Sequence, residues 1–126
     1  MSAVATIPVT PSGSAFGAPI LIAATGTPGT LIHSTIGTFL VTVFDEIWVY
    51  LGNTDTTDRK VTIEWGGVTS PNNLIEVTVP AESGLMLAVP GIRLTGTGAA
   101  VSSVRAFCAT TNVCNAFANV NRMTVS

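Results

Sequence analysis

The sequence predicts an all-β protein: an antiparallel β-sandwich of the jelly-roll type, built as a single domain with an extended N-terminal arm. Short runs rich in Val, Ile, Thr and aromatic residues recur between turns of Gly, Pro, Asn and Asp, which is the pattern of short strands. No window keeps apolar residues at positions i, i+3, i+4 and i+7 long enough for a helix. A chain of 126 residues also has room for one hydrophobic core and not for two.

Several segments are expected as individual strands. Residues 60–65 and 74–79 alternate apolar with polar side chains, so Thr62 and Glu64 are expected in solvent. Residues 46–52 are apolar on both faces, and Asp45-Glu46 is expected as a turn or bend before this buried strand. Pro90-Gly91 is expected to end another strand. The remaining strand candidates are residues 85–89, 92–94, 103–109, 113–118 and 120–125.

The first 30 residues differ from the rest of the chain, because they hold four prolines and no charged side chain. Proline removes ladder donors and favours extended backbone, so residues 1–30 are expected as an arm with one or two edge strands, and residues 31–126 as the β-sandwich domain. An uncharged arm is expected to lie along a surface, its own or a neighbour's. The residues predicted to bind a partner are Val4, Ile7, Val9, Ile20 and Ile22.

Charge is scarce in this chain. Charged residues make up 10% of it, against about 25% in an ordinary soluble domain, and 47% of the residues are hydrophobic. We expect part of such a surface to be covered in an assembly, and therefore a homo-oligomer. The net charge is −2, and only Arg59 and Lys60 of the five basic residues adjoin, so binding to nucleic acid is not expected.

A membrane or secretion role is not expected either. Met1 to Gly17 carries no Lys or Arg, so it lacks the basic start of a signal peptide. The apolar stretch from Ala18 to Ala24 is far shorter than the roughly 20 residues that span a bilayer.

The sequence offers no clear catalytic constellation, so we expect no enzyme, no catalytic residues and no cofactor. A Ser-His-Asp arrangement could use only His33, the single histidine, which lies in a strand-like run without a nucleophile elbow and is expected at the surface or an interface. Asp45 and Glu46 are adjacent, so in a strand they would point to opposite faces rather than act as an acid and base pair.

Metal binding is not expected. Asp55 and Asp58 could touch a calcium ion, but their loop lacks the spacing and glycine of an EF-hand. Cys108 and Cys114 are too few to build a zinc site with His33. They are expected as reduced, partly buried thiols, and a disulfide between them remains the alternative.

Three aromatic side chains raise the possibility of a sugar-binding surface. Trp48 and Tyr50 share one face of their strand and could stack on a sugar ring, with Trp65 as a further candidate. Core packing explains the pair about as well, because the other face of the same strand is apolar too.

Four strings of residues resemble small virion proteins of tailed bacteriophages, and together they cover about residues 31–126. They are the strand Asp45 to Tyr50, the strand end Thr62 to Gly67, the turn Pro80 to Gly84 and the strand Asn119 to Arg122. The resemblance implies a decoration (cement) protein on the capsid exterior, made in the host bacterial cytoplasm. Such a protein would stabilise the capsid by binding at junctions between major capsid protein subunits.

The same resemblance favours a homo-oligomer, with a trimer first, and it supplies no catalytic residues. Two alternatives stay open. One is another virion component, such as a head-fibre base, a tail protein or an adaptor protein. The other is a carbohydrate-binding β-sandwich module on the virion surface.

Overall fold

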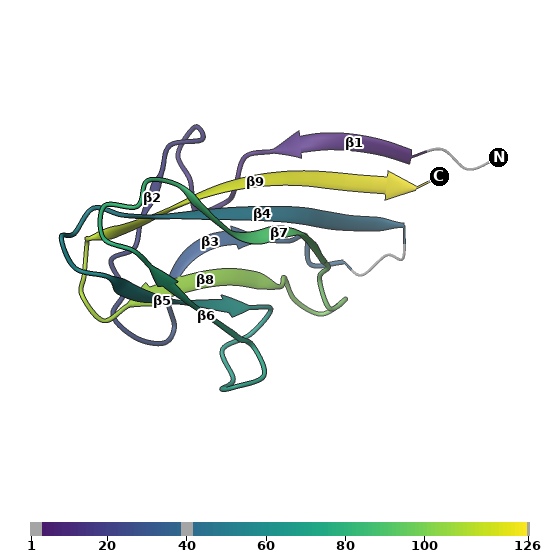
Figure 1. Ribbon diagram of the computed structural model, residues 1–126. Coiled ribbons are helices and arrows are strands. Elements are labelled where there is room, and N and C mark those ends of the chain that lie inside the picture. The colour runs from purple at the N-terminus through teal and green to yellow at the C-terminus, as the bar shows by residue number, and fades with distance from the viewer. Residues whose placement is uncertain (1–3, 39–41, 126) are drawn as a thin grey trace.

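Nine β-strands and no helix make up the part of the chain that the computed structural model describes, residues 4–38 and 42–125 (Figure 1). The strands are β1 (Val4–Val9), β2 (Ile20–Leu21), β3 (Thr30–Ser34), β4 (Val43–Asn53), β5 (Arg59–Trp65), β6 (Leu74–Val79), β7 (Met86–Leu94), β8 (Ser103–Cys108) and β9 (Cys114–Val125).

The strands form two sheets that pack face to face (Figure 1). One has the order β1-β9-β4-β7, with the short β2 also on β9, and the other has the order β3-β8-β5-β6. Every strand pairing is antiparallel. When β2 is set aside, the remaining eight strands follow jelly-roll order: each crosses to the other sheet except at β5 and β6, which pair within the second sheet. The predicted all-β antiparallel sandwich is therefore confirmed.

The core lies between the sheets and is built largely from alternate residues of the central strands. From the first sheet, β4 contributes Ile47, Val49 and Leu51, which are fully buried. From the second, Val61 and Ile63 of β5 face them and are also fully buried. The alternation follows from the period-2 geometry of strands, which sends successive side chains to opposite faces.

The strand β4 passes through Asp45 and Glu46 without a turn, contrary to the sequence-based expectation. Asp45 tolerates this position because its buried carboxylate accepts hydrogen bonds from His33 and Arg122. Cys114–Val125 likewise forms one long strand, β9, where two were expected.

Pro90-Gly91 lies inside β7 instead of ending a strand. Ile92 pairs with Ile47 and Pro90 pairs with Trp48, so Gly91 is one extra residue, a β-bulge. Its φ of +72° suits glycine, and an added Cβ would come within 2.7 Å of the Trp48 indole. The bulge at Gly91 thus allows β7 to continue beyond Pro90, which would otherwise interrupt the strand.

Thr62 and Glu64 are buried, although the alternation of β5 placed them in solvent. The Glu64 carboxylate accepts a hydrogen bond from the Thr27 hydroxyl and another, at 2.6 Å, from the Gly29 N–H. Arg105 donates to the Gly29 carbonyl at 3.1 Å. The segment before β3 therefore covers this part of the outer face of the second sheet, which strand periodicity could not reveal.

The segment that was expected as an N-terminal arm is part of the sandwich over residues 4–30. The strand β1 pairs with β9 from Val4 opposite Val125 to Val9 opposite Val120, as an edge strand of this chain's own sheet. Ile20 and Ile22 are buried in the core. The first 30 residues thus include an edge strand, as expected, and it lies along this chain's own sheet.

Replacing Ile22 by Ala should show that this early segment supplies core. We expect the free energy of unfolding to fall by about 2–5 kcal/mol, the usual loss when a fully buried Ile becomes Ala. The measurement is urea denaturation. The control Val68→Ala, at a half-exposed position, should change stability by less than about 0.5 kcal/mol. An equally small change for Ile22→Ala would contradict this placement.

Candidate functional site

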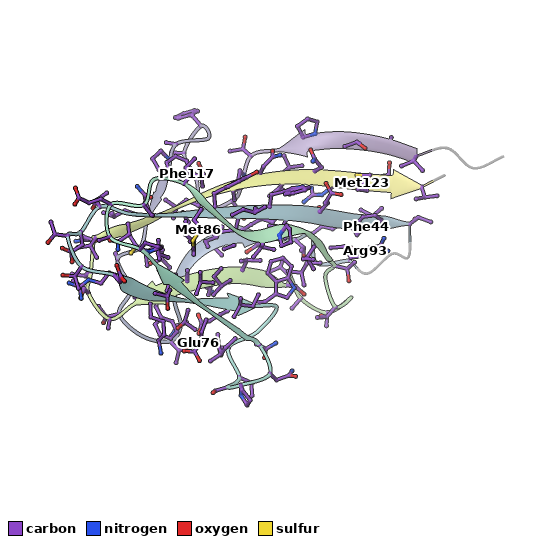
Figure 2. All side chains as sticks on the ribbon, in the orientation of Figure 1. Phe44, Glu76, Met86, Arg93, Phe117 and Met123 are labelled. Carbon is purple, nitrogen blue, oxygen red and sulfur yellow. The ribbon has the colours of Figure 1, made fainter. Side chains whose placement is uncertain are left out.

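The outer face of the β1-β9-β4-β7 sheet carries four aromatic side chains. The register places Leu87 of β7, Tyr50 of β4 and Phe117 of β9 in one cross-strand row. Pro90, Trp48 and Asn119 form the next row. Phe44 and Met123 pair further along, toward the end where β1 begins (Figure 2). We call this surface the aromatic face; it comprises Phe44, Trp48, Tyr50, Leu87, Pro90, Phe117 and Met123.

Polar contacts fix two of these aromatic rings. Glu46 lies between the aromatic rows and accepts hydrogen bonds from the Trp48 indole N–H at 3.1 Å and from the Asn121 amide at 3.3 Å. The Arg93 guanidinium lies 4.2 Å from the centroid of the Phe44 ring, which is a cation–π contact. The aromatic face is therefore a pre-organised surface of partly exposed rings. Its charged side chains, Glu46 and Arg93, lie in one cross-strand row.

The structure brings together two of the three aromatic residues predicted to stack on sugars. Trp48 and Tyr50 lie on the aromatic face, whereas Trp65 points to the inner side of the other sheet and packs against the core. Phe44 and Phe117 join the pair, and the sequence reasoning missed both. Phe44 shares the strand parity of Trp48, which was a usable signal; Phe117 is found only from the β4–β9 register.

The five residues predicted to bind a partner separate into two groups. Val4 and Ile7 of β1 are exposed and available for contact. Val9 packs against the core, and Ile20 and Ile22 are buried within it. Ile20 and Ile22 therefore stabilise this chain's own fold, whereas Val9 remains partly exposed.

A hollow of about 260 Å³ lies at one end of the aromatic face, where β4 ends and β9 begins. We call it the end hollow; Gly52, Thr54, Gly84, Leu85, Asn115 and Phe117 are among the residues that line it. Because Gly52 has no side chain, the Asn115 amide lies directly over it. Among the described residues, the buried Asn115 Oδ1 has no hydrogen-bond donor, which costs about 1–3 kcal/mol for such a group.

His33 is buried, not at a surface or interface as the sequence suggested. Its Nδ1 accepts the Ser12 N–H at 3.2 Å, so the ring proton sits on Nε2, which donates to the Asp45 carboxylate at 2.8 Å. Arg122 donates to both oxygens of the same carboxylate, at 2.7 and 2.9 Å. This cluster joins β3 of one sheet to β4 and β9 of the other.

Ser12, His33 and Asp45 are in contact in the same order as the members of a catalytic triad. Their hydrogen bonds, however, hold the turn after β1 against β3. The Ser12 hydroxyl lies 3.3 Å from His33 Nδ1, which already accepts the Ser12 N–H. The same hydroxyl oxygen accepts the Ser34 N–H at 2.5 Å. These bonds fasten the turn after β1 onto β3.

Burial alone would raise the pKa of Asp45, because a buried carboxylate loses hydration. The hydrogen bonds from His33 and Arg122, together with the charge of Arg122, outweigh burial and hold the pKa of Asp45 below its usual value. The charged form of Asp45 is thus the one that the fold stabilises.

The other candidates for metal or redox chemistry are engaged within the fold. Asp55 forms a salt bridge with Arg59, and Asp58 accepts the Ala81 N–H. Cys108 and Cys114 are free and buried, and burial beside Cys108 raises the pKa of the Cys114 thiol to about 12. Residues 4–38 and 42–125 hold no group of three or more His, Cys, Asp or Glu side chains that could bind a metal ion.

No protein-family model and no curated protein matches this chain. Among solved structures, it is similar to an exo-β-1,3-galactanase from Phanerochaete chrysosporium crystallised with β-1,3-galactotriose, with 17% identity and a TM-score of 0.39. The match covers 100% of this chain and 27% of that enzyme chain. Within the described ranges, no helix is long and apolar enough to cross a membrane.

Replacing Asp45 by Asn should destabilise the protein in a pH-dependent way. At pH 7 we expect a loss of about 3 kcal/mol, since Arg122 and His33 lose the buried carboxylate that they bind. A lowered native pKa stabilises the fold above the unfolded pKa of about 3.9, and that contribution disappears as pH falls through the native value. The difference between the two proteins should therefore shrink below about pH 4.

Urea denaturation across a pH series measures this difference. The control Glu76→Gln removes an exposed pair with Lys60 and should change stability by less than about 0.5 kcal/mol. A loss for Asp45→Asn that stays constant from pH 7 to low pH would show that carboxylate charge is not the cause.

Proposed function

We propose that this protein is a bacteriophage structural protein that decorates and stabilises the capsid, docking by its aromatic face at junctions between major capsid protein subunits. One observation carries the proposal: four partly exposed aromatic side chains lie together on the outer face of one sheet. Aromatic residues with few charges are the composition of the buried centre of protein interfaces. The resemblance of residues 31–126 to small phage virion proteins supplies the partner.

The physical role follows from the shape of the surface. A face held rigid by a sheet loses little conformational entropy on docking, so more of the contact energy remains as affinity. Packed DNA pushes capsid subunits apart, and a protein bound across their junction adds contacts that must break before the subunits separate. Many copies on one lattice also gain from multivalency when they contact one another.

The aromatic face also supports a second function, a carbohydrate-binding module on the virion surface. Trp48 and Tyr50 lie on the same face of β4, and Phe117 is the cross-strand neighbour of Tyr50. Neighbouring partly exposed rings can stack on sugar rings, with the amides of Asn119 and Asn121 as nearby hydrogen-bonding groups. Another virion component, such as a head-fibre base or a tail or adaptor protein, would use the same face on a different protein.

Co-sedimentation with phage capsids assembled without this protein tests the first function. Leu87→Arg places a charge on the aromatic face at a side chain that is 45% exposed, and we expect at least about tenfold weaker capsid binding. The matched control is Val68→Arg, at 47% exposure in the loop between β5 and β6, which should bind like the natural protein. Equal loss in both variants, or no capsid binding by the natural protein, would contradict the proposal. Selective binding to isolated tails or fibres would favour another virion component.

Tryptophan fluorescence with a panel of polysaccharides tests the carbohydrate function. For a capsid-binding protein we expect no saturable change with any glycan. A saturable change that Trp48→Phe abolishes and Trp65→Phe preserves would instead establish the carbohydrate-binding function, since only Trp48 lies on the aromatic face.

A further inference from the structure

Phe16 is fully exposed at the tip of the loop between β1 and β2. Its φ is +56°, a left-handed conformation that is unusual for a bulky residue, and the following Gly17 is also left-handed at +82°. The turn is closed by hydrogen bonds from the Ala18 N–H to the Ala15 carbonyl at 2.9 Å and from the Ser14 hydroxyl to the Ala18 carbonyl at 2.6 Å. The backbone thus holds an aromatic side chain out in water.

The end hollow is apolar and uncharged, so it is suited to receive an aromatic side chain such as Phe16. Its apolar walls are Phe117 and Leu85, the latter 58% exposed, and no charged residue of the described chain lines it. A dry cavity of about 150 Å³ is enough to hold a benzene ring, and the end hollow measures about 260 Å³. Asn115 also lines it, and the Oδ1 of this side chain is buried without a hydrogen-bond partner. The broad terminal torsion of an Asn side chain allows the amide to turn toward an incoming donor.

We infer that Phe16 of one copy of this protein inserts into the end hollow of a second copy. Both halves of the contact are present on every chain, and both are uncharged: residues 10–21 around Phe16 carry no charged side chain. In the described structure, the N–H groups of Phe16 and Gly17 make no hydrogen bond, so they are the donors available to Asn115. The Phe16 side chain fills the apolar hollow, and the backbone N–H of Phe16 or Gly17 donates a hydrogen bond to Asn115 Oδ1.

Each copy offers one Phe16 and one end hollow. Two copies can therefore insert reciprocally as a two-fold dimer, or successive copies can add head to tail until the rotation closes a ring. The inference concerns the protein alone and does not depend on capsid binding: self-association without any capsid present tests it, and co-sedimentation tests the proposed function separately.

Analytical ultracentrifugation over a concentration series measures the self-association. The natural protein should sediment as a defined multiple of 12.9 kDa. Phe16→Ala and Leu85→Glu should each weaken association by about 100-fold or more, because one removes the inserted ring and the other charges its hollow. Phe16→Leu, which restores an apolar side chain, should recover part of the association. The matched control for Leu85→Glu is Val101→Glu at 50% exposure, which should leave association unchanged.

Mixing the two defective variants gives the sharpest test. The Phe16→Ala copy keeps an intact hollow and the Leu85→Glu copy keeps Phe16, so a mixture should form a one-to-one dimer that cannot grow further. Circular dichroism of each variant alone confirms that it remains folded. Association that persists in both single variants, a mixture that stays monomeric, or a natural protein that is monomeric at every concentration would overturn the inference.

Discussion

The pairing of β4 with β9 is the constraint on which the rest of this structure depends. The two strands pair without interruption from Val43 opposite Thr124 to Asn53 opposite Cys114, at the centre of their sheet. The register places Ile47 and Val120 toward the core and sends the aromatic rings outward. Because side chains alternate with a period of two, a slip by one residue would exchange the two faces along the whole strand. The core, the aromatic face and the end hollow therefore exist only in this register.

A slip by two residues would preserve the alternation, and the Asp45 cluster excludes it. In the observed register Arg122 lies opposite Asp45 and donates to both carboxylate oxygens. A shift by two would place Val120 or Thr124 there and leave a buried carboxylate with His33 alone. Apolar burial would tolerate such a shift, whereas an unpaired buried charge would not. The cluster thus selects one arrangement among several that hydrophobic burial alone would accept.

Local patterns in the sequence predict the fold class and several strands, because they depend only on the alternation of neighbouring residues. The predicted strand at residues 74–79 coincides with β6, and residues 60–65 lie within β5. Prediction fails where a distant group changes the environment. Glu64 looks solvent-facing until the Thr27–Gly29 segment covers it, and Asp45-Glu46 looks like a turn until His33 and Arg122 neutralise Asp45. The aromatic face shows the same difference between local and long-range information. Trp48 and Tyr50 can be placed on one face from the alternation of side chains along their strand, whereas Phe117 can be placed there only when the β4–β9 register is known.

The edges of the first sheet bear on how a protein with few charged residues can associate without aggregating. An unprotected edge strand offers its free backbone groups to any other strand, and proline on an edge removes a donor from that ladder. The outer strands of the order β1-β9-β4-β7 each contain one, Pro8 in β1 and Pro90 in β7. Sheet extension from copy to copy is therefore disfavoured along β1 and β7, and the self-association that we propose would use side chains. Side-chain contacts need shape complementarity, which limits them to particular partners. A chain with 10% charged residues can in this way keep apolar side chains at its surface and still associate selectively.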